Sequence, residues 1–110
     1  MDLGAIPFTV TTWKNVPTVE HKGETGTSHW RVHEAGPIRI RMVEYSPGFR
    51  SDHWCAKGHI FFVVDGEFDI RLKDGRRFTL GPGMSFEAGD DAANPHLGES
   101  PRGATVFIVD

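Results

Sequence analysis

Three side chains that commonly bind metal ions fall within seven residues near the middle of the chain. His53, Cys55 and His59 form the pattern H-x-C-x3-H, and Gly66 follows after six further residues. Imidazole nitrogens and a thiolate are typical zinc ligands in proteins. Because side chains alternate across a strand, His53 and Cys55 are expected on one face, and a turn at Gly58 would bring His59 back beside them. The spacing therefore predicts a metal site on the floor of a cavity.

This segment resembles the first motif of the cupins, small β-barrels in which PG-x5-H-x-H-x3/4-E-x6-G supplies three of four metal ligands. Aligned on Pro47, Gly48 and Gly66, Cys55 takes the place of the family's second histidine. His59 takes the place of its glutamate. The chain departs from the family pattern at both positions.

A second cupin motif, G-x5-P-x-G-x2-H-x3-N, is matched loosely by GPGMSFEAGDDAANPHLGES. Gly83 stands at its start, and His96 falls at the place of the fourth ligand. The order Asp52, His53, Trp54, Cys55 is similar to the DHCW motif that names a subset of small cupins. The resemblance covers roughly residue 37 to the end of the chain. It implies a single-domain cupin, a double-stranded β-helix or jelly-roll barrel.

The resemblance further implies one divalent transition metal ion per chain, bound by His53, Cys55, His59 and His96. Three neutral imidazoles and one thiolate carry the same formal charge as the three histidines and one carboxylate of the family. Zinc is the first expectation because the donors are mixed nitrogen and sulfur, with iron or nickel as alternatives.

The residues leave two other interpretations open. A thiolate reaches less far than an imidazole, so Cys55 could lie outside the ligand shell and leave a three-histidine centre with open positions. Alternatively, the histidines are hydrogen-bonded residues of a metal-free barrel, and Cys55 packs as a small hydrophobe. His21, His29 and His33 precede the motif, and we do not assign them to the site.

Length and charge narrow the class of protein. A chain of 110 residues is expected to form one domain with its own core, here residues 1–110. One cysteine excludes an intramolecular disulfide, and the start MDLGAIPFTV has neither a basic leader nor a long apolar run. These features favour a cytoplasmic location. The net charge is -3 with scattered Lys and Arg, so nucleic acid is not an expected partner.

Alternating apolar and polar residues predict an all-β fold. Ile6, Phe8 and Val10 indicate an N-terminal strand, and residues 1–36 are expected to supply N-terminal strands and a loop packed on the barrel. Residues 38–45 alternate most clearly, with Ile38, Ile40, Met42 and Glu44 predicted to face inward.

Turn dipeptides mark further strands. Asp65-Gly66 and Asp74-Gly75 bracket residues 67–73, which predicts a meander of antiparallel strands. The final run ATVFIVD predicts a buried last strand. No helical periodicity exceeds one turn, so a barrel or sandwich is expected.

The run HIFFVV, residues 59–64, is apolar on both faces. If His59 faces the metal, then Ile60, Phe62 and Val64 must face outward. Each such side chain left in water forgoes roughly 1.5–3 kcal/mol of burial. A homodimer that covers this face is therefore expected, although Phe8, Val10 and Trp13 could fold across it instead.

Function is less determined than fold. The absence of the family's glutamate favours a small-molecule binding or sensor module with one metal in the barrel. The alternative is a metal-dependent enzyme of dioxygenase or isomerase type acting on a small organic substrate. A metal-free scaffold is the third class considered.

Overall fold

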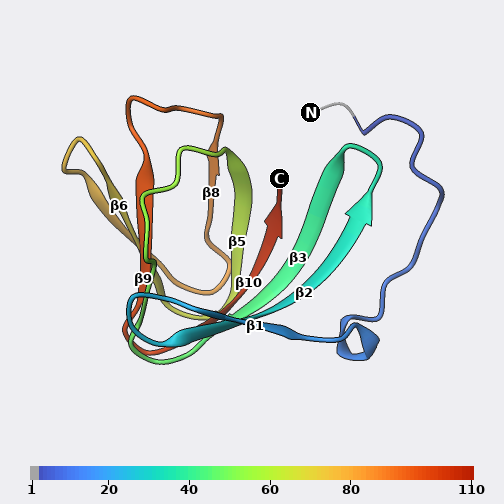
Figure 1. Cartoon of the computed structure of the whole chain (residues 1–110), viewed down its shortest axis with the longest axis horizontal. Coiled ribbons are helices and arrows are strands. Elements are labelled where there is room, and N and C mark those ends of the chain that lie inside the picture. Colours follow the sequence, from blue (N-terminus) through green and yellow to red (C-terminus); the bar gives the residue numbers. More distant parts are fainter. Residues whose placement is uncertain (1–2) are drawn as a thin grey trace.

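A computed structural model describes residues 3–110 as two antiparallel β-sheets with a single 3-10 turn, η1 (Trp13–Asn15) (Figure 1). The strands are β1 (Val19–Lys22), β2 (Thr27–Ala35), β3 (Ile38–Tyr45), β4 (Phe49–Arg50), β5 (His59–Gly66), β6 (Phe68–Leu72), β7 (Arg77–Leu80), β8 (Ser85–Ala88), β9 (His96–Ser100) and β10 (Ala104–Val109). Within these residues no helix is long and apolar enough to cross a bilayer. The predicted all-β class is confirmed.

The two sheets face each other and enclose the core. The larger has the order β1-β2-β3-β10-β5-β8, and the smaller has the order β4-β9-β6-β7. Every pairing between strands is antiparallel, as in a jelly-roll barrel. The most deeply buried apolar side chains come from both sheets: Val43, Phe61, Val63, Phe68, Ile70, Leu80, Val106 and Ile108. The expected last strand is β10, which lies between β3 and β5 at the centre of the larger sheet.

Strand β5 has the predicted orientation. Phe61 and Val63 are 4% and 0% exposed, whereas Ile60, Phe62 and Val64 are 40%, 40% and 44% exposed. His59 lies two residues before Phe61 on the same strand and therefore points to the same inner side. The strand therefore aims its first residue into the barrel and presents an apolar outer face.

Gly66 ends β5 for a steric reason. Its φ is 78°, and a Cβ there would lie 2.2 Å from the carbonyl oxygen of Gly103. The chain crosses here from the larger sheet to the smaller, so β5 and β6 do not pair, and the predicted meander is wrong at this turn. The second predicted turn does join a hairpin, β6 to β7, with Gly75 at φ 100°.

The predicted orientation of β3 is wrong. Arg41 and Val43 are 5% and 0% exposed and face the core, whereas Glu44 is exposed on the outer side. The prediction placed the apolar residues inside and the arginines outside. Instead, Arg41 and the residues two positions away from it face inward. Arg41 can lie inside the barrel because Asp110 is also there and compensates the arginine's charge through a contact of 3.0 Å.

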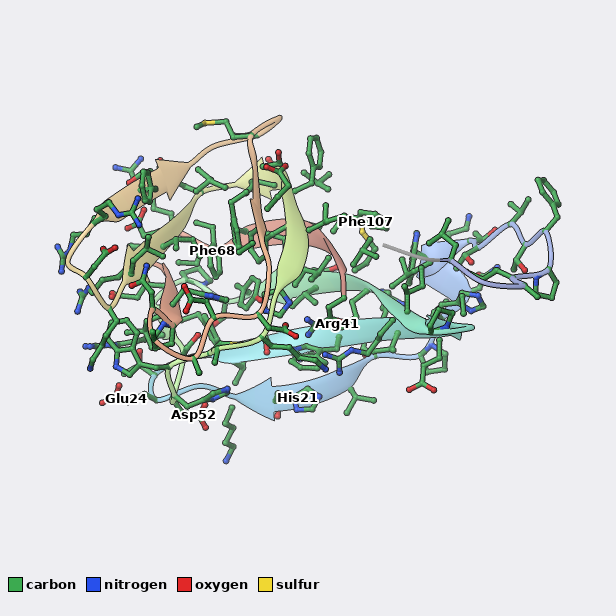
Figure 2. All side chains as sticks on the ribbon, turned by 90° about the horizontal axis from the view of Figure 1, so that it is seen from above. His21, Glu24, Arg41, Asp52, Phe68 and Phe107 are labelled. Atoms are coloured by element: carbon green, nitrogen blue, oxygen red, sulfur yellow. The ribbon has the colours of Figure 1, made fainter. Side chains whose placement is uncertain are left out.

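The N-terminal strand predicted around Phe8 is not formed, and residues 3–12 contain no strand. Phe8 and Val10 are 97% and 80% exposed. Trp13 packs edge-on against Phe107 of β10, with ring centroids 6.3 Å apart, on the outer side of the larger sheet. Figure 2 shows Phe107 on the side toward this segment, and Phe68 between the sheets.

Candidate metal centre

Cys55 and His96 are brought together by backbone pairing. The Cys55 N–H donates to the carbonyl of His96 at 2.7 Å, and the His96 N–H donates back to that of Cys55 at 2.9 Å. This is an isolated bridge rather than part of a strand, so the strand expected at residues 53–55 is not formed. Residues facing each other in such a pair have adjacent side chains. The bridge thus sets Cys55 beside the first residue of β9.

His59 enters the same space from the start of β5. Its Nε2 lies 3.6 Å from the Cys55 Sγ, and its ring centroid lies 5.2 Å from that of His96. One ligand atom from each of the three residues lies within 4.8 Å of the others. The chain can make this approach because residue 58 is glycine: a Cβ there would lie 2.4 Å from the carbonyl oxygen of Ala88. The role of Gly58 is therefore close packing against the end of β8.

His53, the remaining predicted ligand, lies apart from this group. Its side chain is 73% exposed, and its Nδ1 lies 2.6 Å from the Asp52 carboxylate. It does line the same cavity as the three grouped donors. The structure thus gathers Cys55, His59 and His96 and leaves His53 at the edge.

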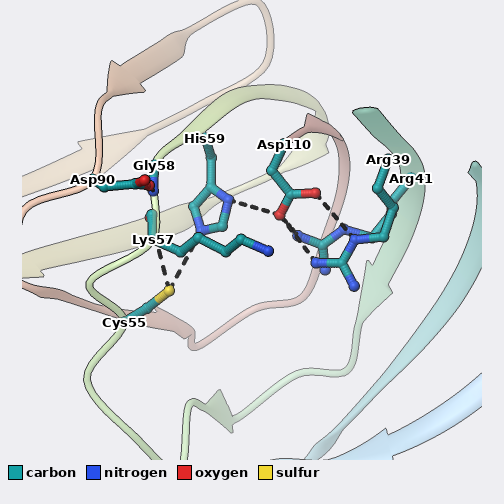
Figure 3. A network of polar contacts seen from close by, with 8 residues as sticks. All are labelled: Arg39, Arg41, Cys55, Lys57, Gly58, His59, Asp90 and Asp110. Atoms are coloured by element: carbon teal, nitrogen blue, oxygen red, sulfur yellow. Dashed lines mark hydrogen bonds and ion pairs between the residues drawn. The ribbon is translucent and has the colours of Figure 1, made fainter. Parts of the chain in front are cut away.

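A buried carboxylate behind His59 was not foreseen from the sequence. The side chain of Asp110 is 1% exposed, and its Oδ2 lies 3.1 Å from His59 Nδ1. Figure 3 marks this contact with a dashed line. Arg39 donates to both carboxylate oxygens at 3.0 Å, and Arg41 donates to Oδ2 at 3.0 Å. With Nδ1 engaged by Asp110, His59 presents Nε2 to Cys55 and His96. The sequence gives no signal for this contact, because Arg39 and Arg41 precede Asp110 by 71 and 69 residues.

Burial favours the neutral form of the two grouped histidines. Desolvation lowers the pKa of His59 to about 4, with further lowering by His96 and Arg41, and the opposing pull of Asp110 does not reverse it. Desolvation also lowers the pKa of His96. Burial disfavours ionisation of Asp110, but hydrogen bonds from Arg39 and the charge of Arg41 hold its pKa below the ordinary value. Neutral imidazoles are the form that binds metal.

Two cavities meet at Cys55 and His96. The first has a volume of about 440 Å³ and extends from Cys55, His59 and His96 toward Arg41 and Tyr45. The second has a volume of about 770 Å³ and is also lined by Cys55 and His96, together with residues of β7 and β8. The group therefore lies inside the barrel and adjoins space for a small molecule.

Solved structures of other proteins share the fold. An RmlC-like cupin from Shewanella frigidimarina NCIMB 400 aligns with a TM-score of 0.71 at 16% identity, over 94% of this chain and 90% of its own. The fold is that of a cupin. This confirms the single-domain barrel architecture that the sequence resemblance implied.

Two enzymes share this cupin fold. Ectoine synthase from P. lautus aligns with a TM-score of 0.74 at 14% identity, over 93% of this chain and 76% of its own. Iron(II)-bound HppE in complex with substrate aligns with a TM-score of 0.72 at 14% identity, over all of this chain and 62% of its own. No protein-family model and no curated protein matches the sequence. At such identities the likeness establishes the fold alone.

Proposed function

We propose that this cupin binds one divalent metal ion through Cys55, His59 and His96 and serves as a small-molecule binding or sensor module. The grouping of three donor atoms within 4.8 Å, beside an internal cavity, is the observation that carries the proposal. Zinc is the proposed metal because one thiolate and two imidazoles suit it, with iron or nickel as alternatives.

The residues around the three donors also suit a bound metal. Asp110 holds Nδ1 of His59, and a carboxylate behind a ligating histidine fixes the ring and raises its basicity. Arg39 and Arg41 in turn hold the carboxylate. A bound divalent ion would supply a Lewis-acidic position at the cavity floor.

His53 is proposed as an exchangeable fourth ligand. To reach the centre its ring must leave Asp52, which it contacts at the exposed mouth of the cavity. A ligand that can leave offers its position to an incoming molecule. The order Asp52, His53, Trp54, Cys55 also supports placing the chain with the DHCW-motif cupins.

Elemental analysis of protein purified without chelators, under metal-replete conditions, tests the metal. The proposal expects close to one metal ion per chain, lost when His59 and His96 are both changed to alanine. Metal content near zero in the parent, or unchanged in the double variant, contradicts it.

A second candidate function is a metal-dependent enzyme, of dioxygenase or isomerase type, acting on a small organic substrate. Two observations favour it: among the described residues three donors are gathered rather than four, and two cavities adjoin Cys55 and His96. Neighbours of the same fold include HppE with iron(II) and substrate. Turnover separates the two functions. A metal-dependent enzyme converts a small organic substrate under metal-replete conditions, whereas a binding or sensor module releases its ligand unchanged.

We also propose a homodimer through the outer face of β5. Ile60, Phe62 and Val64 remain 40–44% exposed. Of the N-terminal residues that could cover them, Phe8 and Val10 are exposed, and Trp13 packs on Phe107 of the neighbouring β10. Twofold association is the commonest way for identical chains to bury such a face. Light scattering during size exclusion should give twice the chain mass, and Phe62→Glu should give monomers. A monomeric parent at micromolar concentration contradicts the dimer.

The remaining assignments follow from the same site. A reducing compartment such as the cytoplasm is proposed because it would keep the Cys55 thiol available to the metal. We treat residues 1–110 as one barrel domain. Its ligand is a small molecule, and nucleic acid is not a proposed partner.

A further inference from the structure

The first cavity carries an excess of positive charge. Among the described residues that line it, the cations are Lys22, Arg39, Arg41 and Lys57, and Asp52 is the carboxylate. Tyr45 adds no negative charge, because burial raises the pKa of its phenol to about 12. Asp110 compensates Arg39 and Arg41 jointly, with one carboxylate for two guanidinium groups. Lys22, Lys57 and Asp52 are exposed, so the charges held inside are those of the two arginines and Asp110, two cations to one anion.

Arg41 is the least solvent-exposed of these cations. It is 5% exposed, and of its guanidinium nitrogens Nη2 donates to Asp110 while Nε is buried with no hydrogen-bond partner. A buried donor without a partner costs roughly 1–3 kcal/mol, and more when the group is charged. Arg39, by contrast, is 33% exposed and donates to both oxygens of Asp110.

The guanidinium of Arg41 is also held in place. Its Cζ lies 4.4 Å from the centroid of the Trp30 ring, and Trp30 is itself anchored by a 2.8 Å hydrogen bond from its Nε1 to the Ser28 hydroxyl. An arginine stacked on an aromatic ring and fixed by one carboxylate loses little freedom on binding a second. Figure 2 shows Arg41 over the strands of the larger sheet, inside the barrel.

Arg41 lies close to the metal centre. Its Nη2 and the Nδ1 of His59 contact the same Asp110 oxygen, at 3.0 and 3.1 Å, so they are separated by no more than the sum of these distances. The walls nearby are apolar, including Phe61, Phe86 and Ile108, which strengthens the field of an unpaired charge. A molecule spanning the two must be small.

We infer that the first cavity binds a small organic carboxylate, with its carboxylate on Arg41 and its remainder directed toward Cys55, His59 and His96. The inference extends the proposed function by naming the chemical class of its ligand. It rests on the proposed metal site only for the end of the ligand that lies away from Arg41. Arginine is suited to this role because its planar fork matches a carboxylate.

Propionate and its neutral isostere propionamide test the inference on the full chain, both zinc-loaded and chelated. Titration followed by NMR of the arginine Nε–H signals should show propionate binding at least about tenfold tighter than propionamide, with the Arg41 signal shifting. Equal affinities, or an Arg41 signal that does not move, would overturn it.

Arg41→Met should lower propionate affinity at least about tenfold, whereas Arg102→Met, which removes the same charge from an exposed position outside this cavity, should leave it unchanged. Equal losses in both would show a general charge effect and overturn the assignment. If Arg41→Met does not fold, the NMR titration of the parent still decides. Metal content is measured separately. A metal-free protein that prefers propionate refutes the metal proposal alone. A metal-loaded protein without that preference refutes this inference alone.

Discussion

The strand-borne and loop-borne donors of the candidate centre are fixed in different ways. His59 begins β5, where antiparallel pairing with β8 and β10 sets its direction, and His96 begins β9, which pairs with β6. Cys55 and His53 lie in the irregular segment between β4 and β5, where a single backbone bridge fixes Cys55 and an exposed contact with Asp52 holds His53.

The difference indicates how rigid each part of the centre is. Donors on paired strands keep their geometry whether or not a ligand is present, whereas a donor on an exposed loop is free to exchange. The proposed centre therefore combines two fixed imidazoles, one thiol fixed by its neighbour and one adjustable histidine.

Removing a strand-borne donor should have the largest effect. His59→Ala or His96→Ala should weaken zinc binding by more than about 100-fold, beyond the roughly 10–100-fold cost of removing a residue behind a ligand. Competition with a chromophoric chelator measures the affinities. His29→Ala is the matched control, because this β2 side chain is 42% exposed and lies 3.4 Å from Glu20. Wild-type affinity in either donor variant would show that the centre lies elsewhere.

Asp110→Asn should have an intermediate effect, a loss of about 10–100-fold in metal affinity. The amide still fills the space, but it cannot compensate Arg39 and Arg41, and it loosens the hold on His59 Nδ1. The same chelator competition measures it. An affinity equal to that of the parent would mean that the carboxylate serves only to neutralise the arginines.

The loop-borne His53 should matter least. His53→Ala is expected to weaken metal binding by less than about tenfold, because the ring is 73% exposed and lies apart from the other donors. A loss as large as that of His59→Ala would place His53 permanently on the metal. It would also remove the contrast between strand and loop.

The parts of the site that could be predicted are those fixed by the alternation of side chains along a strand and by the spacing of the motif. The metal motif placed His59 on the inner face, and strand alternation then assigned Ile60, Phe62 and Val64 to the outer one, because both faces of a strand follow from one residue. The motif spacing singled out Cys55 and His96 as well, although the backbone bridge between them replaces the expected strand.

The arginine pair shows what the sequence could not reveal. Hydropathy assigned Arg41 to the outside, because nothing near it signals a carboxylate 69 residues away in the chain. Only the pairing of β3 with β10 brings Asp110 within reach. The N-terminal strand predicted from Phe8 and Val10, which are exposed, was wrong for a related reason. Alternating apolar residues form a strand only where a partner strand is present.

Acidification should destabilise the chelated protein between about pH 6.5 and 4. The pKa of His59 is lowered by burial to about 4 in the folded protein, against an ordinary value of 6.5, so over this range the unfolded chain binds a proton that the folded chain does not. Stability is thus full above the ordinary pKa and falls as pH drops. Urea unfolding at intervals of pH measures it, and His59→Gln should flatten the dependence. A flat profile in the parent contradicts the buried neutral imidazole.

Anomalous X-ray scattering from a crystal grown with zinc tests the central claim most directly. The account predicts one strong peak per chain, about 2.3 Å from the Sγ of Cys55 and about 2.0–2.1 Å from a ring nitrogen of His59 and of His96. A peak bound by other residues, or no peak between these three side chains in a zinc-loaded crystal, would contradict it.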